Sequence, residues 1–152
     1  MRVWRICRQG HGNQALDGLG GLYASGRWHS KGFPILYAAC SPALAALEVL
    51  VHVDPLLAPP DLRLLAIELP ADLSMEILEP NTLPMDWADV PAPPQLQALG
   101  NAWLRELRTA ALSVPSAVIR VERNVLINPR HPEAARLRLI SDEPFAFDSR
   151  LL

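Results

Sequence analysis

Glycine and proline are distributed very unevenly along the 152 residues, which limits the segments that can form regular structure. Seven of the eight glycines lie between Gly10 and Gly32, so the backbone there is free to turn tightly or to approach a ligand closely. Five prolines lie between residues 80 and 94. They predict a second irregular segment, since proline interrupts both helices and strands. Helices and strands are therefore expected in the remaining segments.

Hydrophobic patterning predicts more strands than helices. Strands are predicted over residues 3–7, 35–39, 62–69, 114–121 and 124–127, and one more between 137 and 147. Ser41-Pro42 predicts the start of a helix that Asp54-Pro55 ends, because serine caps helices and proline is favoured in their first turn. No regular strand–helix alternation is present, which favours a mixed α+β domain over residues 1–152 rather than a doubly wound sheet.

A second helix is predicted from Gln95 to Leu112, because apolar residues recur there at helical spacing. Its buried stripe is expected to contain Leu96, Leu99, Trp103, Leu107 and Ala110.

Charge and hydropathy exclude several classes of protein. A net charge of -2 provides no basic stripe for a phosphate backbone, so we expect no direct nucleic-acid partner. No apolar run approaches the roughly 18 to 20 residues of a membrane helix, and no signal peptide is evident. We expect a soluble cytoplasmic protein without a membrane partner. Cys7 and Cys40 are too far apart for a CxxC motif, which favours two reduced thiols.

Common nucleotide, metal and hydrolase motifs lack their required context. Gly18, Gly20 and Gly21 follow no predicted strand and precede no apolar helix, so they do not form a dinucleotide-binding motif. The four histidines are scattered, without an HExxH pair or a cysteine at zinc-ligand spacing, and no metal is predicted. Ser116 lies in no GxSxG motif, which argues against a serine hydrolase.

Two ionisable residues occupy unusual positions. Glu48 falls on the same predicted helical stripe as Leu44, Leu47 and Val51, where a carboxylate is costly unless a partner compensates its desolvation. Arg27 lies in the glycine-rich segment, within Gly26-Arg27-Trp28. One explanation is a structural ion pair between Arg27 and Glu48. The other is a shared functional site.

An ordered set of motifs resembles the RES domain family. It comprises Gly26-Arg27-Trp28, then Tyr37, then Glu48, then residues 114–118, then residues 124–129 with His131-Pro132. No single motif is specific, but their order is, and the resemblance extends from Arg5 to Arg150. The resemblance implies a fold like that of the diphtheria-toxin-type ADP-ribosyltransferases and NAD as substrate. It also implies a bacterial toxin neutralised by an antitoxin with an Xre-like DNA-binding domain.

The family's characteristic Arg, Glu and Ser correspond to Arg27, Glu48 and Ser116. Cleaving the nicotinamide–ribose bond creates an oxocarbenium-like centre, which a carboxylate such as Glu48 can stabilise. Arg27 offers a planar fork for the pyrophosphate. Tyr37 offers a ring for the nicotinamide and a hydroxyl for orientation, and Ser116 a donor to ribose, phosphate or the nicotinamide amide.

The predicted catalytic residues are therefore Arg27, Tyr37, Glu48 and Ser116, which we expect to line one cleft. The predicted NAD contacts are Arg5, Gly26, Arg27, Tyr37 and Asn128. For Arg5 and Asn128 there are structural alternatives: Arg5 could mark a sheet edge, and Asn128 a strand terminus. Tyr37 and Ser116 likewise have structural explanations, as a core aromatic and a turn residue.

Three acceptors of ADP-ribose remain open at this point: water, phosphate or a protein side chain. The first two make the chain an NAD-consuming toxin by hydrolysis or phosphorolysis, and the third makes it a protein ADP-ribosyltransferase. A rival of another class is a catalytically silent binding module, favoured if Arg27 and Glu48 lie far apart. Whether the chain forms a homodimer is also left open.

Overall fold

The computed structural model describes residues 1–9, 13–54 and 57–151. Gly10, Gly12 and Pro55, which the sequence analysis places in a loop and at a helix end, lie outside the described residues. The strands are β1 (Arg2–Arg8), β2 (Leu36–Ala39), β3 (Leu62–Glu68), β4 (Met75–Ile77), β5 (Ala111–Pro115), β6 (Arg123–Ile127) and β7 (Arg138–Pro144). The helices are α1 (Gly20–Tyr23), α2 (Pro42–Leu50) and α3 (Pro94–Glu106), with short 3-10 turns η1 (Asn13–Leu16), η3 (Pro80–Thr82), η4 (Pro132–Arg136) and η5 (Ser149–Leu151).

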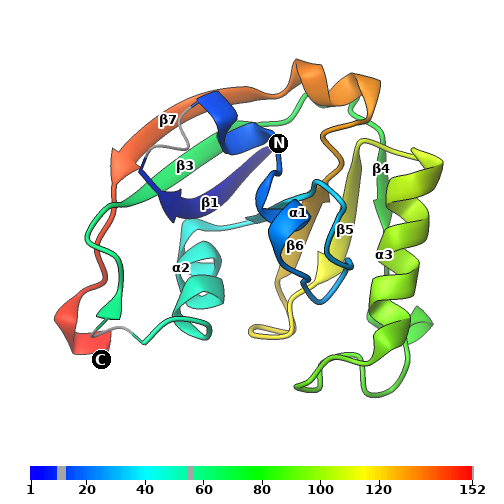
Figure 1. The fold of residues 1–152 in the computed structure, drawn as a ribbon, viewed down its shortest axis with the longest axis horizontal. Helices are drawn as coiled ribbons and strands as arrows, with labels where there is room; N and C mark the ends of the chain where they lie inside the picture. The colour runs from blue at the N-terminus through cyan, green and yellow to red at the C-terminus, as the bar shows by residue number, and fades with distance from the viewer. Residues whose placement is uncertain (10–12, 55–56, 152) are drawn as a thin grey trace.

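The described strands form one mixed sheet in the order β4-β5-β6-β2-β1-β3-β7. Only β4 and β5 are parallel, and the other neighbours are antiparallel. Figure 1 shows β1, β3 and β7 at one end of a bent sheet and β4, β5 and β6 at the other, with α2 beside the first group and α3 beside the second. The predicted α+β class is confirmed.

Both longer helices pack on the same face of the sheet, which we call the helical face. Trp4 pairs with Ala39, and Ala39 pairs with Asn124, so these residues share a face. Ile6 and Ala39 pack there against Leu44 of α2. Farther along the same face, Leu126 and Tyr37 pack in the cluster that contains Trp103 of α3. Asn124 therefore lies on the helical face, at the end of β6 nearer α2.

The start of α2 follows the prediction, and its end comes earlier than predicted. The Ser41 hydroxyl accepts a hydrogen bond from the Leu44 amide at 3.1 Å, and Pro42 occupies the first turn. The helix ends at Leu50 rather than at Asp54. Leu44 and Ala45 are buried, while Glu48 is half-buried at the side of the helix.

The sequence prediction for α3 was wrong at its C-terminus and for part of its buried face. The helix ends at Glu106, because Leu107 adopts a left-handed conformation with φ of 51°. Leu99 and Leu107 are 39% and 42% exposed, contrary to the predicted stripe. The buried positions of the helix are Leu96, Gly100, Trp103 and Leu104.

The strand predictions were accurate at the N-terminal end and less so after α3. Residues 111–115, assigned partly to the helix, form β5, and the predicted strand over 114–121 gives way to a turn after Pro115. β4 was missed, since three residues are too few to show alternation. In the described part of the chain, no helix is long and apolar enough to cross a membrane.

Candidate active site

The carboxylate of Glu48 is held between two strands by neutral hydrogen-bond donors. Its Oε1 accepts from the Ser116 hydroxyl at 2.8 Å and from Asn124 Nδ2 at 2.6 Å. Ser116 follows β5 and Asn124 lies in β6, so α2 is joined to both strands through one oxygen atom. Among the described residues, none donates to Oε2. The carboxylate thus has a fixed orientation and an oxygen left for another partner.

The environment of Ser116 determines where its proton points. The residue is fully buried, and its Oγ accepts hydrogen bonds from the backbone amides of Val118 and Ile119, both at 3.0 Å. With its acceptor capacity used, the hydroxyl donates to Glu48. A backbone bond from the Ser116 amide to the Glu122 carbonyl closes the same turn. In this geometry Ser116 orients Glu48, and its own hydroxyl is not exposed to a ligand.

Arg27 lies within electrostatic range of Glu48 but does not form a direct ion pair with it. Its guanidinium donates to the backbone carbonyls of Trp87 at 2.8 Å and Asp89 at 3.0 Å, which fix it to the proline-rich segment. Burial lowers the pKa of Arg27, and attraction to the negative charges of Glu48 and Asp89 opposes that lowering. Because carbonyls hold the guanidinium, its positive charge is not neutralised by contact with a carboxylate.

Tyr37 is fixed by two hydrogen bonds of its hydroxyl group. The Trp28 amide donates to the Tyr37 hydroxyl at 3.3 Å, and the hydroxyl lies 2.8 Å from His29 Nδ1. His29 Nε2 lies 2.9 Å from the Ala24 carbonyl, which can only accept, so Nε2 carries the proton and Nδ1 accepts from Tyr37. Burial raises the pKa of Tyr37 and lowers that of His29, so both are neutral near pH 7.

Gly26 sits directly against this arrangement. A Cβ at this position would lie 2.6 Å from the Tyr37 hydroxyl oxygen and 3.0 Å from the His29 ring. The absence of a side chain therefore lets the Arg27 segment approach Tyr37 closely. Gly26 supports the site through packing, and its carbonyl accepts from Gln97 Nε2 of α3 at 3.0 Å.

The structure does not bring Arg5 to the Glu48 cluster. Its neighbours Trp4 and Ile6 pack on the helical face with α2, so the Arg5 side chain lies on the opposite face. There its Nη1 donates to the Tyr37 backbone carbonyl at 2.9 Å, while its buried Nε has no partner among the described residues. Burial lowers the pKa of Arg5. The contact to the Tyr37 backbone connects β1 to β2.

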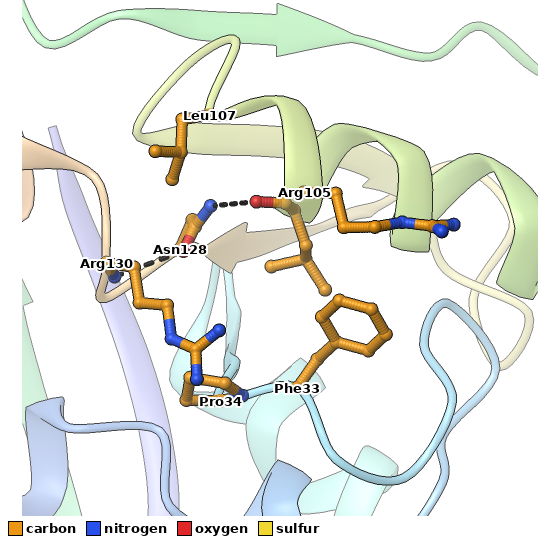
Figure 2. Close-up of a pocket in the computed structure, with 7 residues that line it drawn as sticks. Phe33, Pro34, Arg105, Leu107, Asn128 and Arg130 are labelled. Atoms are coloured by element: carbon orange, nitrogen blue, oxygen red, sulfur yellow. Dashed lines mark hydrogen bonds between the residues drawn. The ribbon is translucent and has the colours of Figure 1, made fainter.

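Asn128 also lies away from this cluster, at the other end of β6 from Asn124. Its Nδ2 donates to the Leu104 carbonyl at 3.0 Å, and its Oδ1 accepts from the Arg130 amide at 3.1 Å. Figure 2 shows both bonds among the residues that line a pocket near the end of α3. The volume of this pocket is about 190 Å³. Residues lining this pocket are Phe33, Pro34, Leu104, Arg105, Leu107, Asn128 and Arg130. Both ends of the amide are used within the protein, so its position suits a structural role.

Two residues of the arrangement were missed by the sequence analysis. Asn124 was included only as part of a strand motif, although its alternation with Leu126 indicates that it shares the face on which Leu126 packs. His29 is one of the four scattered histidines, to which the sequence assigns no role in the site; it is buried, 3% exposed, and oriented by Ala24 and Tyr37. No sequence pattern indicates that bond, because it depends on the path of an irregular loop. No group of three or more potential metal ligands is found among the described residues.

Taken together, these residues provide a carboxylate oriented by neutral donors, a guanidinium that is not bonded directly to a carboxylate, and a neutral aromatic ring. Such a set can stabilise a developing cation and hold an anionic group at the same time. It contains no activated nucleophile, since the Ser116 hydroxyl is occupied and has no histidine beside it among the described contacts.

Comparison with known proteins identifies the family. The RES domain model matches residues 2–148. The chain is 45% identical over 154 residues to "Toxin Res" of Pseudomonas putida, covering 99% of each chain. It is 37% identical over 153 residues to "Prs ADP-ribosylating toxin" of Sphingobium sp., covering 98% of this chain and 95% of that one.

The fold is also found in a solved structure. A chain of the M. tuberculosis MbcT–MbcA toxin–antitoxin complex matches with a TM-score of 0.77 and 21% identity, over 95% of this chain and 84% of the other. At this identity the match describes the fold alone. The family match and the identities to the curated relatives together show that this chain belongs to the RES domain family.

Proposed function

We propose that this protein is an NAD-consuming toxin of a toxin–antitoxin system, which cleaves the bond between nicotinamide and ribose. Membership of the RES family supports the toxin assignment, since the relatives carry the name "Toxin Res". The name "Prs ADP-ribosylating toxin" supports NAD as substrate, because ADP-ribosylation draws on NAD as its donor. We expect the reaction to draw on the cytoplasmic NAD pool.

The observation that carries the proposal is the hydrogen bonding of Glu48. Two neutral donors orient Oε1 while leaving the negative charge intact, and Arg27 is bonded to backbone carbonyls instead of to Glu48. As the bond from ribose C1′ to the nicotinamide nitrogen breaks, its electron pair leaves with nicotinamide and C1′ becomes positive. A carboxylate held in place can stabilise that centre without reorganising, which is where electrostatic catalysis is most effective.

Arg27 is the proposed contact for the NAD pyrophosphate. An arginine offers five donors in a planar fork, and Arg27 uses only Nη1 in its bonds to Trp87 and Asp89. Tyr37 contributes its ring rather than a hydroxyl donor, because its proton is directed to His29. Ser116 acts through Glu48.

The acceptor distinguishes three versions of the reaction. Water attacking C1′ gives ADP-ribose, phosphate gives a phosphorylated ADP-ribose, and a protein side chain gives an ADP-ribosylated protein. Of these three reactions, we propose hydrolysis or phosphorolysis as the activity of this protein. Transfer to a protein is the alternative, and the name of the Sphingobium relative favours it specifically.

A toxin of this kind needs an inhibitor, and we propose an antitoxin with an Xre-like DNA-binding domain. The fold match to a chain of a toxin–antitoxin complex is compatible with such a partner. Expression of this chain alone should stop growth and lower cellular NAD, and co-expression of the antitoxin should restore both. Robust growth with folded wild-type protein alone would favour a catalytically silent binding module.

The direct test is to incubate purified protein with NAD, with and without phosphate, and to identify the products by mass spectrometry. Free nicotinamide with ADP-ribose indicates hydrolysis, nicotinamide with a phosphorylated ADP-ribose indicates phosphorolysis, and a mass increase on an added protein extract indicates transfer. Intact NAD after prolonged incubation would contradict the proposal.

A further inference from the structure

We propose that Asn124 is a positioning residue for Glu48, and that its side-chain amide sets the carboxylate orientation on which turnover depends. This inference rests on the proposed function, since it assigns a role within the same site. Asn124 lies in β6 opposite Ala39 of β2 and Val114 of β5. From there its Nδ2 donates to Glu48 Oε1 at 2.6 Å, the shorter of the two hydrogen bonds to that oxygen.

The two donors to Glu48 come from elements of different rigidity. Ser116 lies in a turn after β5, whereas Asn124 is part of a strand paired on both sides. A strand inside a sheet holds its side chains more precisely than a turn does. Asn124 therefore fixes Oε1 relative to the sheet, and Ser116 completes the orientation from the turn.

Neutral donors suit this role better than cations. A lysine or arginine bonded to Glu48 would offset the negative charge that a developing cation needs. Asn124 and Ser116 restrict the carboxylate without adding charge, and Arg27 is kept on the carbonyls of the proline-rich segment. Oε2 is left for the substrate.

Asn128, which directly follows β6, is an example of an asparagine in a structural role. Asn128 satisfies both ends of its amide, with Leu104 and Arg130. Asn124 instead leaves its buried Oδ1 without a partner among the described residues. Buried polar atoms in structural positions are nearly always paired. The amide is therefore oriented so that its Nδ2 donates to Glu48, and this orientation leaves Oδ1 unpaired.

The test replaces the amide without changing its size. In Asn124→Asp a carboxylate oxygen faces Glu48 in place of the donor, and in Asn124→Leu the donor is lost without added charge. We expect kcat for NAD to fall about a hundredfold in both, since a displaced reacting group costs about that much, while KM changes little. Asn81→Asp makes the same change of charge at an exposed position and should leave kcat unchanged.

A conservative variant and a structural measurement separate this role from general stabilisation. Asn124→Ser keeps a hydrogen-bond donor on a shorter side chain, so its kcat should be higher than that of Asn124→Leu and lower than that of wild type. A merely structural asparagine would instead lower activity in proportion to the unfolded fraction measured by circular dichroism, with no recovery in the serine variant. Full kcat in Asn124→Leu would overturn the inference.

The outcome can also be separated from failure of the proposed function. If wild-type protein does not consume NAD, the proposed function fails, and the crystal structure of Asn124→Leu still tests the positional claim. We expect the Glu48 carboxylate to rotate away from Ser116 in that variant. An unmoved carboxylate would overturn the inference independently of any activity.

Discussion

At the scale of single residues, the site is organised by hydrogen bonds that keep charges apart instead of pairing them. Glu48 is bonded by Ser116 and Asn124, and Arg27 by the carbonyls of Trp87 and Asp89. A direct pair would leave each charge partly neutralised. Separation leaves a negative centre and a positive centre, which suits the proposed substrate NAD, with its phosphates and the cation that develops as its glycosidic bond breaks.

Arg27→Lys should raise KM for NAD about tenfold or more while leaving the fold intact. Lysine keeps the charge but cannot donate to two carbonyls and present a planar fork to a phosphate, and a charge-assisted hydrogen bond contributes roughly 1.5–3 kcal/mol. Steady-state kinetics with NAD provides the measurement. Arg138→Lys, at an exposed position of β7, is the matched control. An unchanged KM would place Arg27 outside the substrate site.

His29 should make the protein less stable in acid. Burial lowers its pKa in the folded state, so the unfolded chain binds more protons between that value and the ordinary pKa of about 6.5. The contribution of neutral His29 to stability is fully present above about pH 6.5 and falls as the pH drops below it.

His29→Gln should therefore show a weaker loss of stability than wild type between about pH 7.5 and pH 5.5. Urea unfolding at several pH values measures this difference. His52→Gln replaces an exposed histidine, and its free energy of unfolding should change with pH as that of wild type does. If the free energy of unfolding depends on pH equally in wild type and His29→Gln, then His29 has the same pKa in the folded and unfolded chain, contrary to this prediction.

Sequence reasoning was most informative where a residue broke a pattern. A charged residue on an apolar stripe identified Glu48, and its contact with Ser116 follows from the fold rather than from any spacing. Asn124 and Asn128 each lie two positions from Leu126, so alternation places both on the face of Leu126 and does not distinguish between them. Arg5 was a candidate because its face of β1 could not be assigned until Trp4 and Ile6 were seen packed with α2.

At the scale of elements, α3 shows where sequence periodicity fails. The predicted stripe is right for Leu96 and Trp103, but Gly100 and Leu104 are buried in place of Leu99. Gly100 packs against the backbone of Trp28. A Cβ on Gly100 would overlap the Trp28 carbonyl oxygen. Glycine in mid-helix normally costs stability, so close packing explains its presence here. The Leu107 conformation then ends the helix and frees residues 111–115 to pair as β5.

Gly100→Ala should destabilise the protein by about 1–3 kcal/mol, because an added methyl group must displace the backbone at Trp28. Gly20→Ala is the matched control: nothing lies within 4 Å of its Cβ position, so it should be neutral or stabilise by up to about 1 kcal/mol. Thermal unfolding of both variants provides the comparison. A Gly100→Ala protein as stable as Gly20→Ala would refute the packing explanation.

At the scale of the whole molecule, the sheet brings together residues that are far apart in the chain. Glu48 and Asn124 are separated by 76 positions, and Arg27 and Trp87 by 60. Most strand segments were predictable from hydrophobic patterning, but β4 and the start of β5 were not. The α+β class followed from the absence of regular strand–helix alternation. Their order in the sheet was not predictable, because it depends on long-range pairings such as β2 with β6. The residues of the candidate site come together because the strands pair in that order.

The most direct test of the account is NAD turnover by Glu48→Gln. The amide keeps the shape of the side chain and removes its charge, so kcat should fall about a hundredfold to a thousandfold, with the unfolding midpoint close to that of wild type. Turnover is measured as nicotinamide released from NAD by the purified variant and by wild type at equal folded concentration. Wild-type activity in Glu48→Gln would contradict the assignment of Glu48 as the residue that stabilises the transition state.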